Sequence, residues 1–131
     1  MSALVIDESS WIAWLAGQGS ALVEPALEEG RVHLPPVVAA ELLSGRLTTR
    51  ERWSLASLLD DLPLVDVDRA HWYRVGRLRS TLRERGLTVS TPDARLAQCV
   101  LDLGAELLTE DRIFSKLAAH APLRLASAGP A

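Results

Sequence analysis

Four acidic residues stand where a carboxylate could take part in chemistry, and two of them end predicted strands. Asp7 follows the apolar run Leu4-Val5-Ile6, which predicts a buried strand that brings an acid to the edge of a sheet. Asp111 follows a second predicted strand, residues 106–109, and precedes a predicted helix in the same way. If the two strands are neighbours, both carboxylates lie at the sheet edge where open α/β folds bind ligands.

The other two acids, Glu41 and Asp93, belong to predicted helices. Glu41 is the only charge within residues 35–43, so we expect a largely buried helix whose carboxylate needs a cation, hydrogen bonds or a proton. It could face a metal-binding cleft or pair with one of the thirteen arginines. Asp93 stands three residues after Ser90, a spacing typical of a helix cap, and the apolar residues that follow predict a helix that packs inward.

Together the four acids predict a site for a hard divalent cation. Clustered carboxylates repel one another and raise one another's pKa unless a cation binds among them. The three histidines and the single cysteine are scattered, so we expect oxygen ligands and Mg²⁺ or Mn²⁺ rather than zinc. Such ions activate water and stabilise in-line displacement at phosphorus. For Asp7, Asp93 and Asp111, helix capping is the alternative explanation.

Strand and helix signals alternate along the chain and predict the elements that position these acids. Alternation of this kind implies parallel strands joined by crossover helices. The predicted fold class is therefore α/β, a three-layer α/β/α sandwich with a mostly parallel central sheet. Pro63 places the third extended segment at an edge of that sheet. The strands are expected at residues 3–6, 31–34, 62–67, 106–109 and 123–125.

Length and composition suit one domain, expected over residues 1–126, with a flexible tail over 127–131. No 18-residue apolar run or signal-peptide pattern occurs, so we expect a cytoplasmic protein without a membrane span. The four tryptophans are expected in the core or at an interface. The net charge is −3, yet six arginines fall within residues 69–85. Arginine suits phosphate contact, although a solvated helix face explains this segment equally well.

Five short motifs span essentially the whole chain and resemble one known family. They are Leu4-Val5-Ile6-Asp7-x-Ser9, Val37-x-x-x-Glu41-Leu42-x-x-Gly45, Leu78-Arg79 to Gly86, Pro92-Asp93-Ala94-x-Leu96-Ala97 and Leu107-Leu108-Thr109-x-Asp111-x-x-Phe114. In order and spacing they resemble the PIN-domain ribonucleases, specifically the VapC-type toxins of toxin–antitoxin pairs. The resemblance implies an α/β/α sandwich that binds Mg²⁺, for which Mn²⁺ can substitute, and that cleaves RNA internally by metal-activated water attack on the phosphodiester. It also implies a homodimer and inhibition by a cognate VapB-type antitoxin.

The resemblance also assigns roles to residues at matching positions. It makes Asp7, Glu41, Asp93 and Asp111 the metal-binding and catalytic acids. It makes Ser9 a polar neighbour that orients water or the Asp7 carboxylate, while a role as helix cap explains Ser9 equally well.

Three positions depart from the family's pattern. Glu8 stands where a small hydroxyl residue is common, Arg95 replaces an apolar residue, and Ile113 stands where many relatives carry a further acid. These departures leave the number of bound ions open. A phosphoacceptor signalling module is a weak alternative, because the lone Lys116 lies inside a predicted helix. A non-catalytic binding protein on the same fold is the other alternative, and the four intact acids argue against it.

Overall fold

The computed structural model describes residues 2–127, which include a four-stranded parallel sheet. The strands are ordered β2-β1-β3-β4, and each neighbouring pair is parallel. The predicted parallel sheet is therefore confirmed. Because β1 and β3 are neighbours, the acids that follow them lie at the same edge. The strands are β1 (Leu4–Ile6), β2 (Val32–His33), β3 (Glu106–Leu108) and β4 (Arg124–Leu125).

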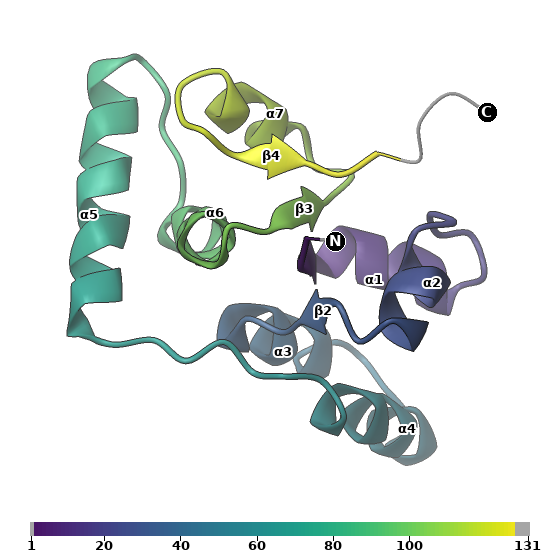
Figure 1. Cartoon of the computed structure of the whole chain (residues 1–131). Helices are drawn as coiled ribbons and strands as arrows, with labels where there is room; N and C mark the ends of the chain where they lie inside the picture. Colours follow the sequence, from purple (N-terminus) through teal and green to yellow (C-terminus); the bar gives the residue numbers. More distant parts are fainter. Residues whose placement is uncertain (1, 128–131) are drawn as a thin grey trace.

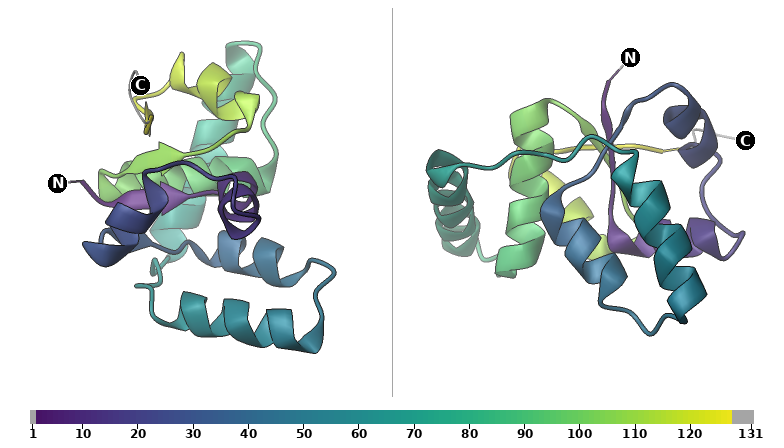
Figure 2. Two further views of the ribbon diagram at one scale, coloured as in Figure 1. Left: turned by 90° about the vertical axis from the view of Figure 1, so that its right-hand side faces the viewer. Right: turned by 90° about the horizontal axis from the view of Figure 1, so that it is seen from below.

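Helices flank the sheet on both sides, which confirms the predicted α/β/α arrangement. Figure 1 shows α5 and α6 on one side of the strands and α1 and α2 on the other. The two views of Figure 2 show α5 crossing over α6 rather than running alongside it. The helices are α1 (Glu8–Leu15), α2 (Val23–Glu28), α3 (Pro36–Leu43), α4 (Thr49–Asp60), α5 (Arg69–Glu84), α6 (Thr91–Leu103) and α7 (Arg112–Ala118).

The predicted strand over residues 62–67 is only partly formed. A single parallel bridge joins Leu64 to Leu34, outside β2. The Leu34 N–H donates to the Pro63 carbonyl at 2.8 Å, and the Val65 N–H donates to the Leu34 carbonyl at 2.9 Å. Pro63 has no N–H with which to extend the ladder. The segment lies at the edge of the sheet, as its proline predicts, but forms no strand there.

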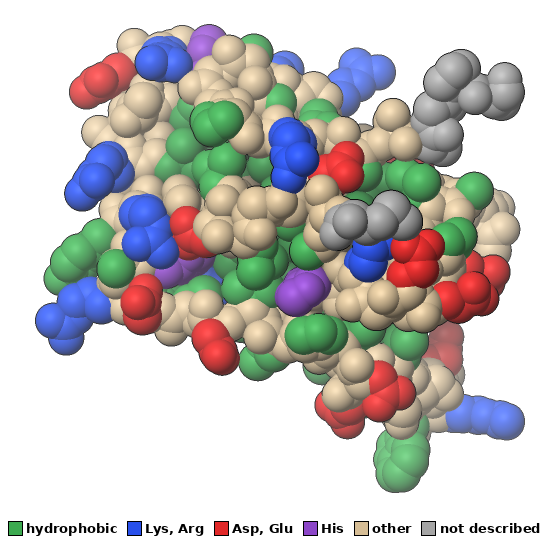
Figure 3. All heavy atoms as spheres, in the orientation of Figure 1, with side chains coloured by type: hydrophobic (Ala, Val, Ile, Leu, Met, Phe, Trp, Pro, Cys, Tyr) green, Lys and Arg blue, Asp and Glu red, His purple; other side chains and the backbone are tan. Residues whose placement is uncertain are grey.

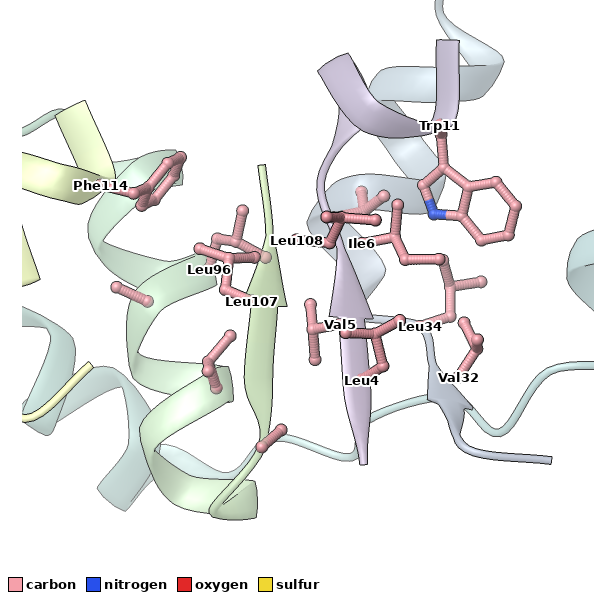
Figure 4. Packing of buried hydrophobic residues seen from close by; sticks show 14 of the residues in the cluster. Leu4, Val5, Ile6, Trp11, Val32, Leu34, Leu96, Leu107, Leu108 and Phe114 are labelled. Atoms are coloured by element: carbon pink, nitrogen blue, oxygen red, sulfur yellow. The ribbon is translucent and has the colours of Figure 1, made fainter. Parts of the chain in front are cut away.

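The core is built on the fully buried central strand. Val5 and Ile6 are both 0% exposed, which explains why β1 is a continuous apolar run rather than an alternating one. Figure 4 shows Trp11 beside Ile6 and Phe114 on the far side of β3. Of the tryptophans expected in the core or at an interface, Trp11 lies in the core, whereas Trp53 is 74% exposed and leaves only the interface expectation, which stays a prediction.

The described residues end at Ser127. The predicted tail over residues 127–131 lies outside them except for Ser127, so that prediction is untested. Across residues 2–127, the helices are all too short or too polar to cross a membrane.

Candidate functional site

Asp7 is the centre of the candidate site. Its side chain is only 5% exposed, and its Oδ1 accepts hydrogen bonds from the Ser9 hydroxyl at 2.7 Å and the Ser10 N–H at 3.0 Å. Its Oδ2 accepts a hydrogen bond from the Thr109 hydroxyl. These donors offset the cost of burying the carboxylate and fix its orientation. Asp7 therefore caps α1 and also presents a fixed carboxylate at the sheet edge.

The sequence leaves two roles open for Ser9, a helix cap or a neighbour that orients the Asp7 carboxylate. The position of Ser9 fits the second role. The helix begins at Glu8 with Asp7 as its N-cap, so Ser9 lies inside the first turn and the capping role is wrong. Besides donating to Asp7, the Ser9 hydroxyl accepts from the Glu110 N–H at 3.2 Å. Ser9 thereby links the end of β1 to the segment after β3, while its catalytic role stays a prediction.

Thr109 belongs to the site, although it was not among the residues expected there. The N-cap of α7 is Asp111, whose Oδ1 accepts from the Ile113 N–H at 3.1 Å. The Thr109 hydroxyl accepts from the Asp111 N–H at 2.9 Å and donates to Asp7. It therefore bridges the acids of the two neighbouring strands. A hydroxyl directly after the strand beside β1 is the sequence signal that could have revealed this role.

Replacing Thr109 with valine is expected to lower the free energy of unfolding by about 1–3 kcal/mol, because the buried Oδ2 of Asp7 would lose a donor. Thr109→Ser keeps the hydroxyl and is the matched control, with a smaller expected loss. Urea unfolding of both variants at neutral pH measures the difference. A valine variant as stable as the serine variant would show that this hydrogen bond does not support Asp7.

Asp93 lies in the first turn of α6, near the same edge. The Ser90 hydroxyl accepts from the Asp93 N–H at 3.2 Å and starts the helix, as the spacing predicts. Partial burial raises the pKa of the Asp93 carboxyl; a hydrogen bond with Ser90 lowers it, and the charges of Asp111 and Asp7 raise it further. The structure thus brings the three aspartates within electrostatic reach of one another.

Glu41 is exposed, which contradicts the prediction of a largely buried helix. The α3 helix buries Val38 and Leu42 and turns Glu41 outward. Within residues 2–127 no arginine pairs with Glu41, so of the two alternatives for this carboxylate the ion pair is not formed. Although the side chain is exposed overall, partial loss of hydration raises the pKa of its carboxyl group, and the charges of three nearby acids raise it further. In decreasing order these are Glu8, Asp93 and Asp7.

Glu8, which departs from the family's sequence pattern, adds a fifth negative charge beside the four acids of the candidate site. Glu8 is half-buried in the first turn of α1, where an acid also favours the helix dipole. Its charge is the largest electrostatic contribution to the raised pKa of Glu41. Glu8 therefore increases the repulsion that a bound cation would relieve.

The donor chemistry of these residues fits Mg²⁺ or Mn²⁺, which prefer carboxylate oxygens. Partial burial first, and the charges of neighbouring acids second, raise the pKa values of Glu41 and Asp93, and a cation would offset that second contribution. Across residues 2–127, however, no three side chains already converge closely enough to enclose an ion. Asp7 is held in place by its donors, whereas the exposed side chains of Glu41 and Asp111 would have to move for the acids to enclose a cation.

A Glu41→Gln substitution is expected to stabilise the metal-free protein at pH 7 by a few tenths of a kcal/mol, since solvent screens an exposed charge. A carboxyl whose pKa rises on folding binds its proton more tightly in the folded state, so stability falls as pH rises above its usual value of 4.5. The gain should therefore vanish near pH 4, where wild-type Glu41 is also protonated. Urea unfolding in EDTA at pH 7 and pH 4 measures this gain in stability. A Glu41→Gln variant that is less stable than wild type at pH 7 would contradict the prediction.

Residues 4–120 match the PIN domain family. The chain belongs to the PIN-domain family. Among its curated relatives are VapC ribonuclease Mb1587 of Mycobacterium bovis and ribonuclease VapC11 of Mycobacterium tuberculosis. Each is 30% identical to it over 131 residues, covering 95% of this chain and 98% of the relative.

Solved structures share this PIN-domain fold. DNA-bound VapBC from Salmonella typhimurium matches with a TM-score of 0.79 and 19% identity, over 96% of this chain and 98% of that one. VapBC-5 from Mycobacterium tuberculosis, a member of the VapBC family of toxin–antitoxin systems, matches with a TM-score of 0.66 and 26% identity, over 95% and 98% of the two chains. Both similarities extend over nearly the whole chain.

Proposed function

We propose that this PIN-domain protein is a Mg²⁺-dependent endoribonuclease and the toxin of a VapBC-type toxin–antitoxin pair. One observation carries the proposal: the buried Asp7 carboxylate is held rigidly by Ser9, Ser10 and Thr109 at an edge where further acids repel one another. Its relatives named VapC ribonucleases support the substrate class. We place its action in the cytoplasm, where such a toxin would meet its RNA.

In this proposal Asp7, Glu41, Asp93 and Asp111 hold the divalent cation. When bound, the cation supplies activation of water and stabilisation of negative charge for an in-line displacement at phosphorus. A water oxygen bonds to phosphorus as the P–O3′ bond breaks, which leaves a 5′-phosphate and a 3′-hydroxyl. Ser9 and Thr109 act through Asp7 by fixing the direction of its carboxylate.

Incubating the purified protein with RNA in Mg²⁺ or in EDTA tests the proposal. Mapping the ends should show internal cleavage and 5′-phosphate termini in Mg²⁺, and intact RNA in EDTA. Equal cleavage in EDTA would contradict the metal-dependent mechanism. Wild-type protein that leaves RNA intact in both solutions would favour a non-catalytic binding protein on the same fold.

An apolar groove between α1 and α4 is the surface that we propose for the VapB-type antitoxin. The groove has a volume of about 770 Å³ and is lined by Trp14, Leu47, Leu55 and Leu58, among others. On its α1 side, Ile12 and Leu15 are 53% and 49% exposed. Apolar side chains exposed along a helix are the usual anchors for a partner's amphipathic helix. None of the four acids lines this groove, whose α1 residues lie in the second half of the helix that Asp7 begins.

The predicted homodimer is part of the same proposal. Trp72 and Tyr73 on α5 are 46% and 65% exposed, and exposed aromatic side chains are enriched at protein interfaces. Sedimentation of the purified protein should give twice the mass of the single chain, and a purely monomeric species would contradict the dimer.

A further inference from the structure

Two basic side chains lie exposed along α7, the helix that begins at the acidic edge of the sheet. Asp111 is the N-cap of α7, so Arg112 is the first residue of the helix and Lys116 lies one turn further on. Side chains four residues apart share one face of a helix, with their Cβ atoms about 5–6 Å apart. Phe114 and Leu117 are buried on the inner face, whereas Arg112 and Lys116 are exposed on the outer face.

A third cation continues this line beyond the end of α7. Arg85, the C-cap of α5, is exposed, and its Nη1 donates a hydrogen bond to the His120 carbonyl at 2.9 Å. His120 follows Lys116 by four residues, just past the end of the helix. Figure 3 shows Lys and Arg side chains along the upper edge of the molecule, over the region where Figure 1 places α7 and the end of α5. Arg112, Lys116 and Arg85 thus form a basic track that starts beside an acid of the site.

The charges of the basic track are not neutralised within the fold. Across residues 2–127, none of its three side chains forms an ion pair with a carboxylate. By contrast, Arg74 binds Asp102 through Nε at 3.1 Å and Nη2 at 2.9 Å, which joins α5 to α6. Arg112 also stands in the first turn of α7, where the helix dipole disfavours a cation. Its charge therefore brings the fold no electrostatic benefit and is available to an anion.

We propose that the basic track binds the backbone phosphates of the RNA strand on one side of the cleavage site, with Arg112 on the phosphate nearest the acids and Lys116 on the next. This inference rests on the proposed function. The acids repel the RNA backbone, so cations within reach of them are needed to hold the strand. Arg112 directly follows Asp111 in the chain, and its guanidinium can contact two oxygens of one phosphate, whereas lysine binds as a point charge.

The test measures binding of a short fluorescein-labelled single-stranded RNA by fluorescence anisotropy in EDTA, over a range of KCl concentrations. Each phosphate contact to a single strand contributes about 0.7 to the slope of log K against log salt. Arg112→Gln and Lys116→Gln should therefore each reduce the slope by about 0.7 and weaken binding about 5-fold, and the double variant should reduce the slope by about 1.4. Arg112→Lys keeps the charge and should keep the slope.

Arg69→Gln is the matched control for charge. Arg69 is an exposed arginine at the start of α5, at the end of that helix remote from Arg85, so this variant should bind RNA as wild type does. Equal losses in Arg69→Gln and Arg112→Gln would show an effect of overall charge and overturn the inference. So would unchanged affinity and slope in the double variant of Arg112 and Lys116. A double variant in which only the sedimentation of the protein changes would also overturn it, since the track would then contact a second copy of the chain.

Urea unfolding separates RNA binding from a structural role of Arg112. Arg112→Gln should unfold at the same urea concentration as wild type or a higher one, because the substitution removes a cation from the first turn of a helix. A lower midpoint would show that the fold needs Arg112 and would overturn the inference. Failure of the proposed function appears separately, as RNA that wild type leaves intact in Mg²⁺.

Discussion

An Asp7→Asn variant should lose RNA cleavage by a factor of roughly 10³ or more while remaining folded. Asparagine has the shape of aspartate, so its amide oxygen can still accept from Ser9 and Ser10 and cap α1. It carries no charge, however, and its amide nitrogen stands where Oδ2 would bind a cation. The loss should therefore lie in the chemical step, measured as kcat/KM for RNA in Mg²⁺.

The control for Asp7→Asn is Asp61→Asn, which removes an exposed carboxylate at the end of α4. It should cleave RNA as wild type does, since Asp61 does not contribute to the raised pKa of either Glu41 or Asp93. Circular dichroism should show the same helix content in all three proteins. An Asp7→Asn variant with wild-type activity would exclude Asp7 as a catalytic ligand.

A Leu15→Glu substitution should weaken binding of the cognate antitoxin about 100-fold or more and leave RNA cleavage unchanged. Leu15 is 49% exposed in the free protein, so a charge there is tolerated by the fold. In the complex the same side chain would lose apolar burial and bring a charge to the apolar contact with the partner. Calorimetric titration with the antitoxin measures the loss.

Trp53→Ser is the matched control for the groove. Trp53 is a larger and more exposed apolar residue on α4, at 74% exposure, but it does not line the α1–α4 groove. Antitoxin binding should therefore persist in this variant. If Trp53→Ser weakens binding and Leu15→Glu does not, the antitoxin occupies a different face of the protein.

The sequence predicts the sheet well because its strongest signals are local. A fully apolar run followed directly by an acid and a helix marks β1, two buried leucines followed by acids and a helix mark β3, and parallel pairing then brings Asp7 and Asp111 to one edge. The third extended segment is harder to predict, because its composition favours a strand while pairing depends on backbone groups. Pro63 supplies only a carbonyl to that pairing, and a single bridge results.

The candidate site could be predicted as a set of acids but not as a geometry. Capping and ligation looked like alternatives for Asp7, yet one carboxylate caps α1 and faces the site at the same time. Apolar neighbours suggested that Glu41 is buried, whereas a helix of eight residues has room for an outward face. The Thr109 bridge arises from a contact between distant segments, which no local pattern reveals.

Direct titration with Mn²⁺ tests the central claim, that these carboxylates hold a divalent cation. The metal-free wild-type protein should bind Mn²⁺ in calorimetry, and more tightly as pH rises, because the cation competes with the protons that the raised pKa values of Glu41 and Asp93 retain. Asp93→Asn should bind markedly more weakly. Absence of Mn²⁺ binding by wild type at neutral pH, or equal binding by Asp93→Asn, would contradict the account.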